Sequence, residues 1–139
     1  MRQYASRLSG PLLDRIDLRV AVPRVPPRDR RDHALTEGSA VVRGRVVSAR
    51  ARQLGRLAGT GVFANAHMSS RHLRRLCALE PGATALLDRA YERLRLSARA
   101  CDRVVKVAQT IADLAGADTI DAGHISESLS YRARGAGES

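Results

Sequence analysis

The sequence is poor in aromatic residues and in cysteine. Aromatic residues make up 3% of its 139 positions and tryptophan is absent, so a platform that stacks several nucleic-acid bases is not expected. The two cysteines, Cys77 and Cys101, each lie among apolar residues of a helical pattern. Because cysteine in such a pattern is usually a small buried hydrophobe, we expect neither a disulfide framework nor a metal knuckle.

Long hydrophobic runs are also missing. No apolar stretch approaches the roughly 20 residues that cross a bilayer, and the N-terminal segment MRQYASRLSGPLLDR lacks the continuous apolar stretch of a signal peptide. The sequence therefore predicts a cytoplasmic protein without membrane contact.

Motifs that carry chemistry are absent as well. No G-x-x-x-x-G-K-[ST] motif is present, so the chain has no phosphate-cradling loop of its own and is not expected to hydrolyse ATP alone. The four histidines, His33, His67, His72 and His124, show no zinc spacing. His124 and Glu127 form an i, i+3 pair without a second such pair, so we predict no metal site.

What the sequence has in excess is arginine. The formal charge is +10, and Lys106 is the single lysine among 24 basic residues. Residues 1–60 carry most of the net charge, with 13 arginines against 5 acidic residues. Such a field favours phosphate-bearing partners through counterion release, with arginines 43, 50 and 56 as candidate contacts. A plain solvated basic surface is the alternative.

The N-terminal region reads as the edge of a larger structure. Residues 12–16 predict a brief helix, and the period-two alternation of residues 18–22 predicts a strand. A single strand is not stable by itself, so residues 1–24 are interpreted as the distal edge of a domain whose remainder lies elsewhere. The proline-rich and charged residues 25–38 predict a linker.

From Ser39 onward the pattern is helical. We expect a mainly α fold in which residues 39–134 form a bundle of about five helices, followed by a disordered tail at 135–139. The five predicted helices run from Ser39 to about Leu57, from Ser69 or Ser70 to Cys77, from Pro81 to Leu94, from Ser97 to Gly116 and from Ala122 to Tyr131. Ser39 is expected to cap the first of them, and Ser97 is expected to cap the fourth, which is predicted to be the longest.

Two arginines differ from the others in their placement. Arg15 follows apolar residues of a short helix, and rigid placement is what an arginine needs to stabilise charge on a transferring phosphoryl group. Arg99 lies in the first turn of the helix after Ser97, where the helix dipole already favours an anion. The alternative for Arg15 is a surface salt bridge with Asp14 or Asp17, and Arg99 can likewise be an ordinary surface arginine.

Several ordered segments resemble the C-terminal part of AAA+ ATPases of the magnesium-chelatase-like ComM/YifB family, and together they cover nearly the whole chain. They are L-S-G-P-L-L-D-R-I-D at residues 8–17, Ala49 to Gln53 with Arg56, Asn65-Ala66, residues 76–79, L-R-L-S-A-R-A at residues 94–100, V-A-Q-T-I-A-D-L at residues 107–114, and residues 124–132.

The resemblance implies a piece of a ring-forming motor, a homo-hexamer, that hydrolyses ATP with Mg²⁺ held mainly by core subunits. By position, Arg15 matches the arginine finger of the L-L-D-R motif, and Arg99 matches the sensor-2 arginine that contacts ATP phosphate. The helical region would be the lid, and residues 39–57 resemble the extra helix that displaces it in some relatives. Whether Arg99 acts in cis or in trans stays open. ComM-like proteins are associated with DNA branch migration in natural transformation, which is the implied function of the complete protein.

The chain also departs from the family. The Walker A, Walker B and sensor 1 motifs are absent, and Gln109 stands where the family usually has arginine, which removes one positive charge and is expected to weaken a lid contact. A truncated gene, a frameshifted remnant, a misplaced start and a real split subunit all fit this absence. The competing hypotheses are a stand-alone basic helical module that binds nucleic acid or a partner protein, and a nonfunctional remnant.

Overall fold

A computed structural model describes residues 16–22, 24 and 37–133 of the chain. Arg15, all of the predicted helix at 12–16 except Ile16, most of the predicted linker and the predicted tail lie outside these residues.

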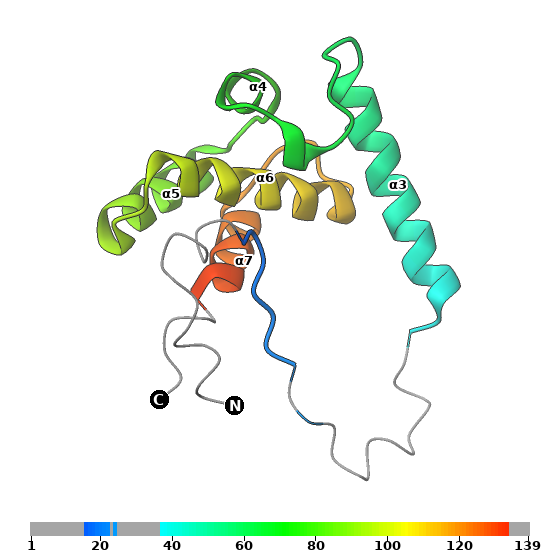
Figure 1. Cartoon of the computed structure of the whole chain (residues 1–139), viewed down its shortest axis with the longest axis horizontal. Helices are drawn as coiled ribbons and strands as arrows, with labels where there is room; N and C mark the ends of the chain where they lie inside the picture. The colour runs from blue at the N-terminus through cyan, green and yellow to red at the C-terminus, as the bar shows by residue number, and fades with distance from the viewer. Residues whose placement is uncertain (1–15, 23, 25–36, 134–139) are drawn as a thin grey trace.

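The described residues are mainly helical, which confirms the predicted fold class. The helices are α3 (Ser39–Leu57), a short 3-10 turn η2 (Asn65–His67), α4 (Ser70–Leu76), α5 (Pro81–Leu94), α6 (Ala98–Ala115) and α7 (Ala122–Ala133). Figure 1 shows α6 at the centre of the bundle, and α6 contacts α3, η2, α4 and α7, while α5 packs on α7. Within the described part of the chain, no helix is both long and apolar enough to cross a membrane.

The ends of these helices follow local chemistry. The Ser97 hydroxyl accepts a hydrogen bond from the Ala100 amide at 3.1 Å and caps α6, as predicted. Gly116 ends α6 with φ of 73°, a conformation that glycine adopts without a steric penalty. One predicted cap is wrong. Gly38 occupies the N-cap position of α3 without a side-chain bond, and Ser39 is the first helical residue. The helix α6 is also one residue shorter than α3, so it is not the longest.

The core lies along α6. Its apolar positions repeat at three- and four-residue spacing, so that Val104, Val105, Ala108 and Ala112 point inward. Alanine at 108 and 112 leaves room for neighbouring helices to approach closely. The rest of this cluster comes from other elements: Leu57, Met68, Leu73, Cys77, Ala83, Ile120 and Ile125.

The segments that enter α5 and α7 are joined by backbone hydrogen bonds. Ile120 donates to Ala78 at 2.8 Å and accepts from Glu80 at 2.9 Å, forming a short parallel bridge between Leu79 and Ile120. Within the described residues, this bridge is the only pairing of β type. The strand predicted at residues 18–22 pairs with no other strand there, so the segment stays an irregular extended stretch.

Candidate functional site

Arg99 is the second residue of α6 and its side chain is exposed. No acidic group precedes it in the first turn, and within residues 37–133 no hydrogen bond or ion pair occupies its guanidinium. Unpaired amide groups and the helix dipole make the start of an 18-residue helix favourable for an anion. Arg99 thus lies in the first turn of α6 as predicted, with an exposed side chain, whereas its contact with phosphate stays a prediction.

Arg99 is the first of three basic residues on one face of α6. Arg103 and Lys106 follow it at i+4 and i+7, spacing that places the three basic side chains on the same side of a helix. The segment at residues 16–22 lies on this face. The Arg103 guanidinium contacts the Asp17 carboxylate at 3.2 Å, and the Arg19 amide donates to the Tyr131 carbonyl on α7 at 3.0 Å. The structure thus attaches the residues that follow Arg15 to the helix that carries Arg99.

A groove of about 300 Å³ lies beside this attachment. Its walls are mostly apolar and come from segment 16–22, η2, α6 and α7, with Leu18, Val107, Ile111, Leu114 and Tyr131 among the lining residues. Leu18 is about half exposed, so segment 16–22 is only partly covered where it contacts α6.

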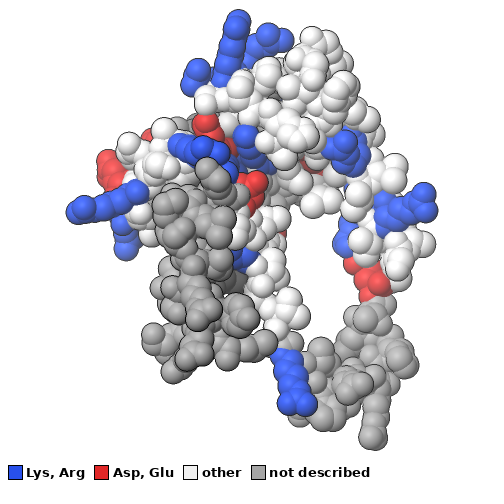
Figure 2. All heavy atoms as spheres, in the orientation of Figure 1, with Lys and Arg blue, Asp and Glu red and all other residues white. Residues whose placement is uncertain are grey.

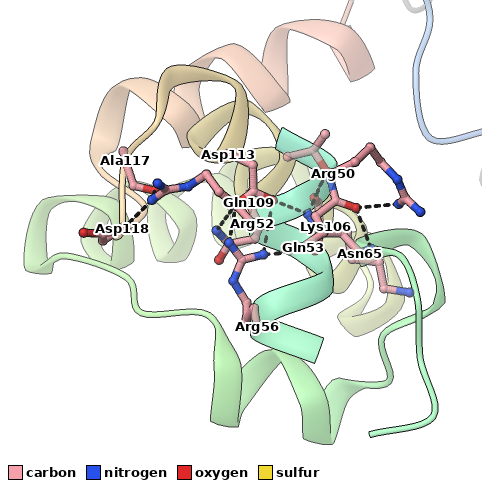
Figure 3. Close-up of polar contacts among 11 residues, drawn as sticks. Arg50, Arg52, Gln53, Arg56, Asn65, Lys106, Gln109, Asp113, Ala117 and Asp118 are labelled. Atoms are coloured by element: carbon pink, nitrogen blue, oxygen red, sulfur yellow. Dashed lines mark hydrogen bonds and ion pairs between the residues drawn. The ribbon is translucent and has the colours of Figure 1, made fainter. Parts of the chain in front are cut away.

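The arginines of α3 do not all belong to the predicted basic surface. Arg56 forms a paired contact with the Asp113 carboxylate on α6, and one of its nitrogens also donates to Asn65 Oδ1 at 3.2 Å (Figure 3). The Asp113 side chain has no exposed area and that of Arg56 is 15% exposed. The prediction that Arg56 contacts phosphate is therefore wrong, because its guanidinium already pairs with the internal carboxylate of Asp113.

The same cluster includes neutral side chains. Asn65 Nδ2 donates to Asp113 Oδ2 at 2.9 Å and to Thr110 Oγ1 at 3.0 Å, so Asn65 bridges η2 and α6. Nearby, Arg52 contacts Asp118 and donates to the Ala117 carbonyl at 2.9 Å, as Figure 3 shows. These contacts join α3, η2 and the end of α6 by polar groups, and each buried polar atom of Asn65 and Asp113 has a partner, as buried polar groups require.

Gln109 belongs to this cluster and is 1% exposed. Its amide donates to Asp113 Oδ1 at 3.5 Å, at the limit of a hydrogen bond. Position 109 is therefore internal. Glutamine there leaves Arg56 as the cation on Asp113 in the described region, so arginine at position 109 would change the charge of the interior and not that of the surface of the helical domain.

Cys77, Cys101, His72 and His124 serve local structure. Burial raises the pKa of the Cys77 thiol from its ordinary value of 9.0 to about 11 and, to a smaller extent, raises the pKa of Cys101. Both thiols are therefore poor nucleophiles at neutral pH. His72 and His124 accept hydrogen bonds from the backbone at the starts of α4 and α7. Glu127 accepts from the Tyr131 hydroxyl at 3.0 Å, so His124 and Glu127 face different partners.

Sequence reasoning missed the Asp17–Arg103 pair and the role of Asp113. Arg103 lies four residues after Arg99, a spacing that gives two arginines one face, and this signal was present. Nothing local in the sequence connects Asp17 to α6, because Asp17 and Arg103 are 86 positions apart and meet only through the fold.

The described fold and site define a small helical domain with an exposed arginine at the start of its central helix, tied to a segment from the preceding region. Residues 36–132 match the family model described as "Magnesium chelatase, subunit ChlI C-terminal", and residues 1–30 match "Magnesium chelatase, subunit ChlI". The chain therefore belongs to the magnesium chelatase ChlI C-terminal family.

Similar proteins agree with this assignment. The chain is 41% identical over 132 residues to the uncharacterized protein YifB of Salmonella typhimurium and to the competence protein ComM of Haemophilus influenzae, and the alignment covers 94% of this chain and 25% of each relative. An uncharacterized protein of Mycobacterium tuberculosis is 38% identical over 139 residues, with 97% of this chain and 27% of the relative covered. The chain thus spans about a quarter of the length of these relatives, and it resembles a C-terminal portion of ComM/YifB proteins.

Proposed function

We propose that this chain supplies two arginines to ATP hydrolysis in a cytoplasmic AAA+ ring related to ComM. In this proposal Arg15 is the arginine finger and Arg99 the sensor-2 arginine. ATP and Mg²⁺ are held mainly by a nucleotide-binding core, the ring is a homo-hexamer, and its substrate is DNA undergoing branch migration. A guanidinium beside a transferring phosphoryl group stabilises the charge of the transition state, an effect of about 10³–10⁵ in rate for arginine fingers in general.

The observation that supports this proposal best is the attachment of segment 16–22 to α6. Arg15 lies two residues before Asp17, at most about 7 Å of extended chain, and Asp17 is paired with Arg103, one helical turn beyond Arg99. A finger acts on the nucleotide of a neighbouring subunit. Because the same helix face holds Arg99, the attachment favours both arginines acting on that neighbouring nucleotide, and thus Arg99 acting in trans.

The first test uses a chimera in which residues 1–139 replace the matching region of the Haemophilus influenzae ComM relative. Arg15→Ala is expected to leave ATP binding nearly unchanged and to lower kcat by at least about a hundredfold, since a finger acts on transition-state charge. Arg99→Ala is expected to weaken nucleotide binding, lower kcat, or both. Arg89→Ala, an exposed arginine on α5, is the matched control. Unchanged turnover in Arg15→Ala contradicts the proposal, as does a chimera without ATPase activity when the parent relative has it.

Mixing variants separates action in cis from action in trans. If both arginines serve the same neighbouring nucleotide, every site in a mixture of Arg15→Ala and Arg99→Ala subunits lacks one of them, and activity is not restored. If Arg99 serves its own subunit, a quarter of the sites in an equal mixture receive both arginines and activity returns in part. Restoration of activity in the mixture therefore contradicts action in trans.

A further inference from the structure

The basic residues of the chain are unevenly balanced by acids. From Gly38 to Leu79 the sequence contains eight arginines and no aspartate or glutamate. Three of these arginines are neutralised by carboxylates outside the stretch: Arg45 by Glu37, Arg52 by Asp118 and Arg56 by Asp113. The structure therefore separates arginines that are paired with carboxylates from those whose charge is left for solvent or a partner.

Three of the remaining arginines lie together on α4. Arg71, Arg74 and Arg75 are exposed, and no ion pair or hydrogen bond joins their guanidinium groups to other described residues. Their i, i+3, i+4 spacing places them on one face of the helix, with neighbouring Cβ atoms about 5–6 Å apart. The opposite side of α4 carries Leu73, which is buried in the core.

Among the described residues, no ion pair joins a carboxylate to the α4 arginines, although Asp102 lies near the start of this helix. Asp102 on α6 accepts a hydrogen bond from the Ser70 hydroxyl at the first residue of α4. In Figure 2, blue side chains project from the end of the molecule formed by α4, and red atoms lie below them. The α4 face therefore keeps an uncompensated charge of about three units.

An exposed aromatic ring lies in the loop that precedes η2 and α4. Phe63, the single phenylalanine of the chain, is 67% exposed. It lies in the loop that leads from α3 through η2 into α4, and this loop and α4 stand at the same end of the molecule in Figure 1. The loop is shaped by Gly59 and Gly61, both with φ of 74°. Phe63 does not belong to the core cluster of the described fold, and most of its ring is left in water.

We infer that Phe63 and the arginines 71, 74 and 75 form a contact surface for single-stranded nucleic acid. The guanidinium groups contact phosphates, and the phenylalanine ring stacks on one base. Single-stranded nucleic acid is favoured over an acidic peptide because it offers both a regular phosphate chain and exposed base faces, which match the two features of the surface. An arginine fork also binds phosphate oxygens in pairs.

This inference deepens the proposed function, in which DNA is the substrate, but it does not depend on the proposed role in ATP hydrolysis. The surface uses neither Arg15 nor Arg99, and binding of nucleic acid requires no nucleotide. Loss of ATPase activity in Arg15→Ala and loss of nucleic-acid binding in the α4 variants are thus separate results, and either can fail while the other holds.

The test measures binding of the whole chain to a fluorescent 20-nucleotide mixed-sequence single strand by anisotropy, at several salt concentrations. The triple variant Arg71→Gln, Arg74→Gln, Arg75→Gln is expected to reduce the slope of log K against log salt by about 2, since each phosphate contact on a single strand contributes about 0.7. Phe63→Ala is expected to weaken binding about fivefold or more at each salt concentration, with the slope unchanged.

The matched control removes three arginines from another face: Arg89→Gln, Arg93→Gln and Arg95→Gln on and after α5. It changes the net charge equally and is expected to reduce the slope by less than half as much. Circular dichroism and the melting temperature confirm that the variants are folded. The inference is overturned if the parent chain does not bind at low salt, if both triple variants behave alike, or if polyglutamate binds as well as the oligonucleotide. Equal affinity for duplex DNA together with an unchanged Phe63→Ala variant overturns the single-strand assignment.

Discussion

The pair between Arg56 and Asp113 predicts a large loss of stability when one partner is removed. Arg56→Met keeps the length of the side chain and leaves the Asp113 carboxylate, which has no exposed area, with hydrogen bonds only from Asn65 at 2.9 Å and Gln109 at 3.5 Å. Breaking a buried ion pair on one side costs about 3–5 kcal/mol. Because Arg56 is itself 15% exposed, water reaches part of the pair, and we expect the lower end, about 3 kcal/mol.

The assay is urea unfolding followed by circular dichroism at 222 nm, with thermal melting alongside it. For a domain of about 100 residues, 3 kcal/mol corresponds to a fall in Tm of about 12–24 °C. The matched control is Arg45→Met, which breaks the exposed pair with Glu37. Exposed pairs contribute little, so this variant is expected to change the free energy of unfolding by less than about 1 kcal/mol.

A second variant distinguishes a charge effect from a packing effect. Combining Arg56→Met with Asp113→Leu removes the unpaired carboxylate, and replacement of a whole buried pair by apolar groups is often nearly neutral. We therefore expect the double variant to be more stable than Arg56→Met alone. The reasoning is refuted if Arg56→Met costs less than about 1 kcal/mol, or if the double variant is no more stable than the single one.

Three further predictions concern other parts of the described fold. Ser97→Ala removes the cap of α6 and is expected to lower the free energy of unfolding by about 1 kcal/mol in urea titrations, and no change would show that water replaces the cap. The raised pKa of Cys77 favours the folded state below pH 9, so stability should fall between pH 9 and about pH 11 by roughly 1.4 kcal/mol per pH unit, and a Cys77→Ala variant should lack this part of the fall. Asp17→Asn removes the pair with Arg103 and should speed hydrogen exchange at the Arg19 amide severalfold while leaving the stability of the helical region within about 0.5 kcal/mol, and unaltered exchange would mean that the pair does not hold the segment.

The helices could be predicted from sequence because their signals are local. Ser97 before an apolar repeat and Gly116 after it define α6, and Pro81 at a first-turn position defines the start of α5. The start of α3 could not be placed as well, since glycine at position 38 gives a backbone that needs no side-chain cap. Local sequence signals therefore predict the helices, but they do not always predict the residue at which a helix begins.

The partners of the arginines could not be predicted, because each depends on contacts between distant positions. Arg50 and Arg56 both belong to α3, yet Arg50 is exposed and bonded to Gln53, whereas Arg56 reaches Asp113, 57 residues away. Net charge over residues 1–60 treats both as part of one basic surface. Only the fold shows which positive charges are paired with carboxylates inside the domain. The expected phosphate contacts therefore lie on α4 and do not include Arg56.

The same distinction bears on how the two arginines of the proposed ATPase site are linked. Arg103 lies on the α6 face between Arg99 and Lys106, and its contact with Asp17 is made by a guanidinium that is largely buried against a carboxylate that is about half exposed. Such a pair contributes little to global stability, but it fixes the direction in which the chain approaches α6. A change in the orientation of α6 would therefore be transmitted to Asp17, which stands two residues after Arg15 in the sequence. The value of this contact lies in geometry, which is why its loss should be visible in local exchange and in turnover before it is visible in unfolding.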